Sequence, residues 1–356
     1  MEKLIKQHRK LYEDFEVIDF VDEDALVALR SQVDVDCSVE LHWTWNYGSE
    51  VAELRALYEK GKVNQWNAET DLDWSIPVSR DDWLVSPEAS MLAQLTKLMG
   101  KDEATQKAAM FDEINYLLSQ LLHGEQAALQ LCGQLTNVCD KLDEKSYAAS
   151  QVIDEARHVE AFAKFIQRKM GTIHPISGTL KILLDRLLLA PTAQKKTLGM
   201  QTLFEGMAVG IMDLMRRDCR NPLLTEMIRR VEQDEARHAA FGVLMMRRVV
   251  QEAEPQQLHE MEDWAFEILE ALNASQQLDM LRLFGPKYGI DPEMATRMAV
   301  GMPNFAEFNS LIYMHTVIPN LKSLGLITER TESQWRKLGM MTDKRTDATL
   351  EFTSLN

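Results

Sequence analysis

The chain is poor in cysteine and has no long apolar run. Only four cysteines occur in 356 residues, and none of them forms a C-x-x-C pair. This scarcity excludes a disulfide scaffold and predicts free thiols in a reducing cytoplasm. The most apolar stretch, 180–190, is interrupted by three charged residues, and no apolar signal segment follows Met1. We therefore expect no association with a membrane.

Positive charge is also scarce, with 39 Lys and Arg against 55 Asp and Glu and a formal net charge of −16. Nucleic acids and anionic membrane surfaces are themselves negative, so neither is expected as a partner. The sequence lacks a glycine-rich phosphate loop and any useful alternation of polar and apolar residues. A nucleotide-binding fold around a parallel sheet is therefore not expected.

Helical periodicity dominates from about residue 86 onward. It predicts long helices over 103–139, 143–170, 192–219 and 222–252, and a shorter apolar helix over 178–190. Short turns join the long helices in pairs, and the longer segment 171–191 crosses between the pairs. The predicted fold class is all-α: a ferritin-like four-helix bundle with additional helices at both ends.

We divide the chain into four parts around this core. Residues 1–100 are predicted as an N-terminal extension, in which 1–35 form a helical arm and the tryptophan-rich stretch 37–85, with a helix over 49–60, covers the outside of the bundle. Residues 101–252 are predicted as the dimetal bundle. Residues 253–340 are a C-terminal helical extension, and 341–356 a polar tail.

The most informative motif is Asp-Glu-Ala-Arg-His, which occurs at Asp154–His158 and again at Asp234–His238. In each copy a further glutamate lies 30 residues before the motif glutamate, so the whole set repeats after 80 residues. Glu and His at i and i+3 share one helix face and can bind one metal ion. Two such pairs, each with a glutamate from a partner helix, predict a two-metal site. The six predicted ligands are Glu125, Glu155, His158, Glu205, Glu235 and His238.

The surroundings of these glutamates favour a bound cation. Most helix positions one and two turns from Glu125 and Glu205 are apolar. An unpaired carboxylate is costly to bury there, so a cation is its simplest partner. Four carboxylates balance two divalent ions, and oxygen with imidazole ligands suits iron or manganese. Two iron ions are our choice, with manganese left open and O₂ as the co-substrate.

Helical phase predicts further residues around the metal ligands. Asp154 and Asp234 precede their histidines by four residues and are expected to accept the second imidazole N–H, with Arg157 and Arg237 pairing with them. A surface cluster of ion pairs is disfavoured by the duplicated register. Six positions are expected to line a substrate pocket beside the metals: Ala128, Cys132, Phe162, Ala208, Val209 and Gly242.

Over about 105–250 the chain resembles the ferritin-like superfamily of di-iron carboxylate oxidases. The Asp-Glu-x-Arg-His form at both positions is similar to that in the hydroxylase subunits of bacterial multicomponent monooxygenases. The resemblance implies the same six ligands, with Asp154 and Asp234 behind them. It also implies a threonine four residues after Glu205, where this chain has Val209.

Two other families of this superfamily differ at marker positions. Ribonucleotide reductase small subunits carry a radical tyrosine seven residues after the glutamate that matches Glu155, and Phe162 stands there. Aryl-amine N-oxygenases carry an additional metal-binding histidine where this chain has Val231. Both differences predict more distant kinship, and the second leaves N-oxygenation open. A rubredoxin-type cysteine pair, as in rubrerythrins, is missing.

These observations predict an O₂-dependent di-iron oxidoreductase, in first place a monooxygenase of a small organic substrate. The alternatives are a ferroxidase or another iron-binding protein, and an N-oxygenase of an amine. The large helical additions favour an oxygenase, because iron storage needs only a compact four-helix unit. Electrons are expected from a separate donor, such as a ferredoxin or a reductase, or from the substrate. A homodimer is left open.

Overall fold

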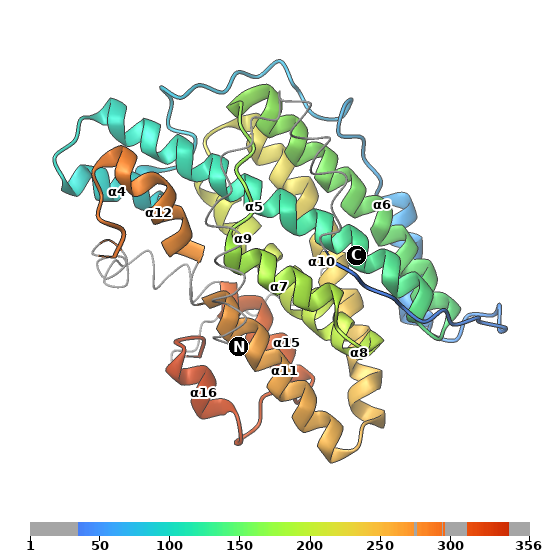
Figure 1. Ribbon diagram of the computed structural model, residues 1–356. Helices are drawn as coiled ribbons and strands as arrows, with labels where there is room; N and C mark the ends of the chain where they lie inside the picture. The colour runs from blue at the N-terminus through green and yellow to red at the C-terminus, as the bar shows by residue number, and fades with distance from the viewer. Residues whose placement is uncertain (1–34, 274–275, 294, 296–311, 342–356) are drawn as a thin grey trace.

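The computed structural model describes residues 35–273, 276–293, 295 and 312–341 (Figure 1). The predicted arm over 1–35 lies outside these residues except for its last position, and the predicted tail lies outside them after residue 341. No described helix is both long and apolar enough to cross a membrane.

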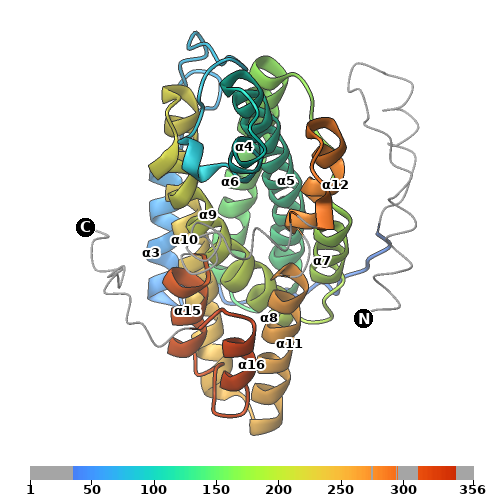
Figure 2. The same ribbon diagram turned by 90° about the vertical axis from the view of Figure 1, so that its left-hand side faces the viewer.

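Four long helical segments form the core of the molecule. They are α5 (Glu103–Val138), α6 (Leu142–Phe165), the π-helix η3 (Thr197–Phe204) continued by α9 (Glu205–Asp218), and α10 (Pro222–Glu252). α5 packs along α6, η3 and α9 pack along α10, and α6 also contacts α10. Figure 2 shows the four segments running side by side. The all-α, ferritin-like prediction is confirmed, and the described residues contain no strand, only an isolated bridge between Val85 and Cys219.

The helix ends follow from capping residues in the sequence. The Asp102 side chain accepts a hydrogen bond from the backbone N–H of Thr105 at the start of α5, and Asn221 does the same for Leu224 at the start of α10. Each side chain satisfies an N–H group that has no partner within the helix. α6 continues through the π-helix η2 (Ile166–Met170) to Gly171, whose φ of 98° suits glycine and ends the helix.

The predicted helix over 192–219 is divided in the structure. It consists of α8 (Ala193–Lys196), η3 and α9, so that a π-helix ends directly before Glu205. The backbone of η3 approaches α10 at Gly242, which lies against the peptide between Gln201 and Thr202. π-Helical segments often occur at functional sites, and this one sets the position of Glu205.

Shorter elements surround the bundle. α3 (Ala52–Val63) packs on α6, α4 (Met91–Leu98) follows the short turn η1 (Pro87–Ala89) and packs on α5, and α7 (Gly178–Leu188) crosses between the two helix pairs. α11 (Pro255–Asn273) contacts η3 and α7, and α12 (Gln276–Tyr288) contacts α5. η4 (Tyr313–Val317) packs on α9 and leads into α15 (Ile318–Ser323), before α16 (Glu332–Lys337). α11, α15 and α16 gather at one end of the bundle in Figure 1.

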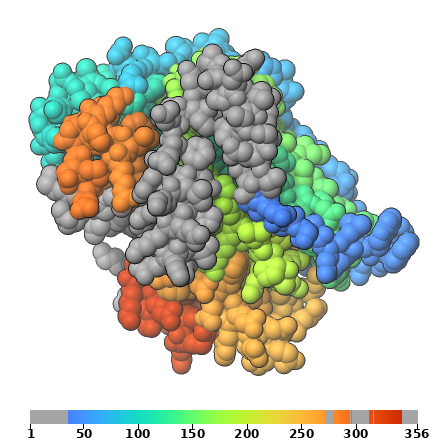
Figure 3. Space-filling model, in the orientation of Figure 1, coloured from blue at the N-terminus to red at the C-terminus, as the bar shows by residue number. Residues whose placement is uncertain are grey.

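The tryptophan-rich stretch has two different parts. Its first part, from residue 35 to about 50, lies on the surface and is dark blue in Figure 3. There Trp43 and Trp45 stack on each other and are 70% and 75% exposed. They do not cover the bundle as predicted, and the segment is held by polar contacts, among them those of His42 with the end of α5 and with Asp140. Trp66, in contrast, is buried.

Two large apolar clusters fill most of the described core, and a third, smaller one lies between α4, α5 and α12. The first large cluster includes Leu131, Tyr147 and Phe241, and the second includes Leu118, Phe162 and Val231. On α5, α6 and α10 a predicted metal ligand separates the residues of one cluster from those of the other, whereas on α9 Met207, which follows Glu205, still belongs to the first cluster. The bundle therefore has an ionisable layer across its middle, between two apolar layers.

Gly242 provides a test of the contact between α10 and η3. A Cβ atom at this position would lie 2.6 Å from the carbonyl carbon of Gln201 and 2.8 Å from the amide nitrogen of Thr202. Because backbone cannot yield as a side chain can, we expect Gly242→Ala to lower the free energy of unfolding by about 1–3 kcal/mol. The control is Gly133→Ala in α5, which has open space at its Cβ position and should stabilise by about 0.5–1 kcal/mol. Urea unfolding that gives both variants the same free energy of unfolding would contradict this packing.

Candidate metal centre

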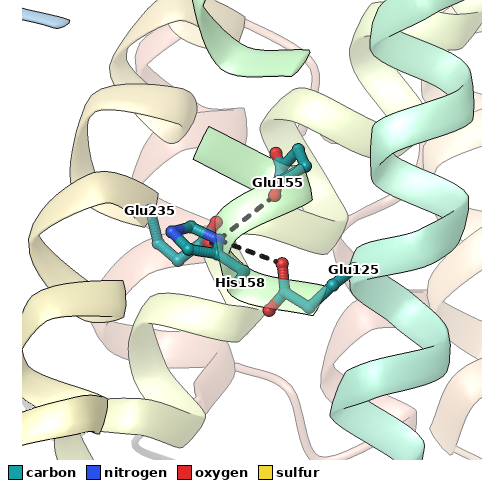
Figure 4. A group of neighbouring side chains, drawn as sticks. All are labelled: Glu125, Glu155, His158 and Glu235. Atoms are coloured by element: carbon teal, nitrogen blue, oxygen red, sulfur yellow. Dashed lines mark hydrogen bonds and ion pairs between the residues drawn. The ribbon is translucent and has the colours of Figure 1, made fainter. Parts of the chain in front are cut away.

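The structure brings the six predicted ligands together in the middle of the bundle. Glu125 comes from α5, Glu155 and His158 from α6, Glu205 from the first turn of α9, and Glu235 and His238 from α10. All six side chains are buried, and none is more than 6% exposed. Figure 4 shows four of them pointing toward one another. Glu125, Glu155, His158 and Glu235 form one group that could hold a metal ion, and Glu155, Glu205 and His238 form a second.

The imidazole of His158 lies at the centre of the first group. Its Nδ1 atom is 3.2 Å from Glu125 Oε2, 3.2 Å from Glu155 Oε2 and 3.0 Å from Glu235 Oε1. One ring nitrogen can donate at most one hydrogen. At least two of the three carboxylate oxygens therefore receive no hydrogen bond from it.

His238 has the corresponding position in the second group. Its Nδ1 atom lies 3.2 Å from Glu155 Oε1 and 3.1 Å from Glu235 Oε2. Glu155 and Glu235 thus each direct one oxygen toward each histidine, as bridging carboxylates would. Glu125 belongs only to the first of these two groups, and Glu205 belongs only to the second.

The charges of the metal-free site are balanced by protons. Burial and the charge of Glu235 raise the pKa of Glu125 and of Glu205 well above the usual range. Burial opposes charge on the histidines, but the carboxylates outweigh it and raise the pKa of His158, and that of His238 to about 10. All four shifts favour the protonated form of these groups. Two divalent cations would replace the four protons charge for charge.

The donor set fits two hard or borderline cations. Four carboxylates and two imidazoles are present, and the buried atoms Glu155 Oε2 and Glu235 Oε1 have no hydrogen-bond donor. The nearby thiol of Cys132 does not join this set. Burial raises the pKa of Cys132, and its sulfur accepts a hydrogen bond from the Gln201 amide at 3.3 Å.

The two aspartates cross between the helices behind the histidines. Nε2 of His158 on α6 lies 3.1 Å from Asp234 Oδ2 on α10, and Nε2 of His238 on α10 lies 3.4 Å from Asp154 Oδ2 on α6. Burial opposes ionisation of both carboxyl groups, but the hydrogen bond and charge of the partner histidine lower the pKa of each. Each histidine is thereby oriented with Nδ1 toward the cluster of glutamates.

Two arginines each bind both aspartates. Arg157 contacts Asp154 Oδ1 at 2.6 Å and Asp234 Oδ2 at 2.8 Å, while Arg237 contacts Asp234 Oδ1 at 2.5 Å and Asp154 Oδ2 at 3.1 Å. All four side chains are buried. The two positive and two negative charges cancel, so that the layer behind the histidines is neutral and fixes both aspartates in place.

Three contributing residues were missed by the sequence analysis. The Gln65 amide donates to Asp154 Oδ1 at 3.0 Å, and the Trp66 indole N–H donates to Asp234 Oδ2 at 2.8 Å. Gln151 donates to Glu155 Oε1 at 2.8 Å and lies within 3.1 Å of Glu205 Oε1. Helical phase could have revealed Gln151, which precedes Glu155 by four residues on α6. No periodic signal marks the other two, because they lie outside the duplicated segments.

A cavity of about 80 Å³ lies beside Glu125 and Glu205. Two of the six predicted pocket positions, Ala128 and Ala208, line it. The other four are placed differently: Cys132 is bonded to Gln201, Phe162 is buried in an apolar cluster, Val209 is half-buried, and Gly242 contacts η3. The remaining lining residues come from α5, α7, η3, α9 and the turn into η4: Leu117, Gln120, Leu121, Gly124, Leu180, Phe204, Met207, Ile211, Ile312 and Tyr313.

The fold and the site together define a ferritin-like dimetal carboxylate protein. The family model described as p-aminobenzoate N-oxygenase AurF matches residues 49–317. The chain belongs to this family, and it is a non-haem di-iron, O₂-dependent oxidoreductase. The superfamily prediction is thus confirmed, whereas the distance inferred from Val231 is corrected: the family match extends over most of the chain although this position lacks the histidine.

The chain is also similar to solved structures of an R2-like ligand-binding oxidase. One variant of that oxidase, reconstituted anaerobically with a Mn/Fe cofactor, is 17% identical with a TM-score of 0.47, covering 80% of this chain and 99% of that chain. A second variant is 19% identical with a TM-score of 0.45 and the same coverage. No curated protein sequence matches the chain.

The proton-binding groups predict how the stability of the metal-free protein depends on pH. The pKa of His238 in the folded protein, about 10, exceeds the ordinary histidine value of 6.5. Its contribution is therefore complete below pH 6.5 and is lost as the pH rises toward 10. The raised pKa of Glu125 and Glu205 acts in the same direction, since unfolding lets both ionise.

We expect the melting temperature of the metal-free protein to fall between pH 6.5 and 9, and the gain on adding iron to grow over the same range. His238→Gln should flatten the slope of the metal-free protein. A melting temperature that rises with pH, or the same slope in this variant, would contradict the protonation that we describe.

The indole of Trp66 provides a separate test. Trp66→Phe keeps an aromatic ring but removes the N–H donor to Asp234, which orients His158. Such changes behind a metal ligand commonly weaken metal binding by about 10- to 100-fold. We expect a loss of this size in iron affinity, measured by competition with a chelator. Trp74→Phe is the control, because its indole donates to the carbonyl of Ala68, away from the site. Equal affinities in the two variants would refute the role given to Trp66.

Proposed function

We propose that this protein N-oxygenates a small arylamine in the cavity beside Glu125 and Glu205. The observation that carries the proposal is the position of that cavity, which has apolar walls and ends on one carboxylate from each of the two ligand groups. Membership of the N-oxygenase family supports the choice of nitrogen over carbon as the atom oxidised.

The six buried glutamates and histidines would hold the metal ions, and Glu155 and Glu235 each direct one oxygen toward each histidine. Two iron ions held there would supply the activation of O₂. The overall reaction consumes an arylamine, O₂, two electrons and two protons, and yields an arylhydroxylamine and water. We propose a separate donor, a ferredoxin or a reductase, as the source of the electrons. The four cysteines are free, which supports a reducing cytoplasm as the location.

The chain's own residues contribute position and exclusion of water. Asp154 and Asp234 hold the imidazoles, and the Arg157–Arg237 pair holds the aspartates. The side chains of Leu121, Phe204 and Ile211 form an apolar wall around the place where the amine would lie. Such a wall keeps bulk water from the reacting atoms and strengthens electrostatic interactions inside the site.

The test is a reaction of the iron-loaded protein with aniline, a chemical reductant and ¹⁸O₂. We expect two irons per chain and incorporation of ¹⁸O at nitrogen, detected by mass spectrometry of phenylhydroxylamine and its more oxidised products. Glu205→Gln should lower the rate by at least about 100-fold, because it removes a charged ligand. Glu160→Gln, at a half-exposed position on α6, is the matched control and should react normally.

Two results would overturn the proposal. Oxygen incorporated only at ring carbon would indicate C-hydroxylation. Uptake of many irons per chain, without oxidation of an amine, would indicate the ferroxidase or storage function instead.

A further inference from the structure

The charge of the cavity indicates which arylamines it can accept. Of the lining residues that the structure describes, none is a lysine, arginine or histidine. The two ionisable side chains there besides a tyrosine are Glu125 and Glu205, which we assign to the metals. No positive side chain in the described wall could therefore pair with an acidic group on a substrate.

Two uncharged polar side chains, Gln120 and Tyr313, line the cavity. Gln120 is held in place, since its amide nitrogen donates one hydrogen to the carbonyl of Pro175 at 3.0 Å and its oxygen accepts from the backbone N–H of Ser177 at 2.8 Å, which leaves it one amide hydrogen. Tyr313 lines the cavity and is buried, and burial raises the pKa of its hydroxyl. It stays protonated at neutral pH and can donate a hydrogen bond to an uncharged acceptor.

The cost of burying an ion decides between substrates. An ionised carboxylate moved into an apolar site without a cation loses favourable hydration that the site does not replace, even after relaxation of the protein. A carboxamide or ester carbonyl of the same size loses much less, and Tyr313 can supply one of its hydrogen bonds. The ring of Phe204 in the wall adds a flat apolar surface for an aromatic substrate.

We propose that this enzyme acts on uncharged arylamines and rejects arylamines that bear a carboxylate, such as p-aminobenzoate. Tyr313 determines this specificity together with the lack of a cation among the described residues of the wall, by donating to a neutral acceptor on the ring opposite the amine. The proposal rests on the proposed N-oxygenation and names the substrate class of the same site.

The experiment compares 4-aminobenzamide with 4-aminobenzoate, which have nearly the same shape and differ in charge. Binding of each to the iron-loaded protein is measured by calorimetry under nitrogen, so that no turnover occurs, and N-oxygenation is measured separately in air with a reductant. We expect the benzamide to bind at least about 100-fold more tightly than the benzoate. Equal or tighter binding of the benzoate would overturn the proposal, and so would failure of both compounds to bind at millimolar concentration.

The two readouts separate this proposal from the proposed function. Tight binding of the benzamide without oxidation at nitrogen would refute N-oxygenation and leave the substrate class standing. Preferential N-oxygenation of the benzoate would do the reverse.

Variants test the physical cause. Leu121 lines the cavity from α5 and is half-buried, so Leu121→Arg can place a cation in the wall. It should reduce the preference for the benzamide by tenfold or more. Leu129→Arg adds the same charge at a half-buried position of α5 outside the cavity wall and should leave the preference unchanged.

Tyr313→Phe should weaken binding of the benzamide by about 3- to 10-fold and leave the binding of aniline unaltered. A preference that is insensitive to both Leu121→Arg and Tyr313→Phe would overturn the proposal.

Discussion

The structure depends on the burial of ionisable side chains across the middle of a helical bundle. Four glutamates and two histidines lie between two apolar clusters, with almost no exposure to water. Such a layer is stable only if its charges cancel. Protons on Glu125, Glu205 and the two histidines achieve this in the metal-free chain, and two divalent cations achieve it in the proposed holoprotein. The ligand layer and the apolar layers therefore have to be understood as one structure.

The neutral layer behind the histidines, formed by two aspartates and two arginines, explains how flexible side chains are held in one geometry. Asp154 and Asp234 each serve the histidine of the opposite helix, so the hydrogen bonds that orient the imidazoles also join α6 to α10. Arg157 and Arg237 each contact both aspartates. A change on either helix is consequently transmitted to both histidines. This coupling ties the packing of the bundle to the geometry of the site.

Much of this could be predicted from the sequence, because its signals are local. The spacing of Glu155 and His158, repeated 80 residues later, places them on helix faces, and the helical periodicity predicts the helix ends within a few positions. The contacts of Gln65, Trp66 and Tyr313 were not predictable, since they join segments that are far apart in the chain. The π-helix before Glu205 was not predictable either, because it depends on the close approach of η3 to Gly242. The absence of a histidine at Val231 predicted a distant relation to the N-oxygenases. This prediction was wrong, because a single position says little about a family match that covers residues 49–317.

Gln65 and Trp66 are neighbours in the chain, yet each bonds to a different aspartate of the duplicated pair. The internal repeat has no second copy of this dipeptide. An amide and an indole are unequal donors, so a centre built from two matching halves becomes asymmetric through a segment that the duplication does not include. The two ligand groups are therefore held by different donors, and part of this difference comes from the N-terminal extension. The repeat itself adds to it, since Gln151, which bonds to Glu155, is replaced by Val231 at the corresponding position 80 residues later.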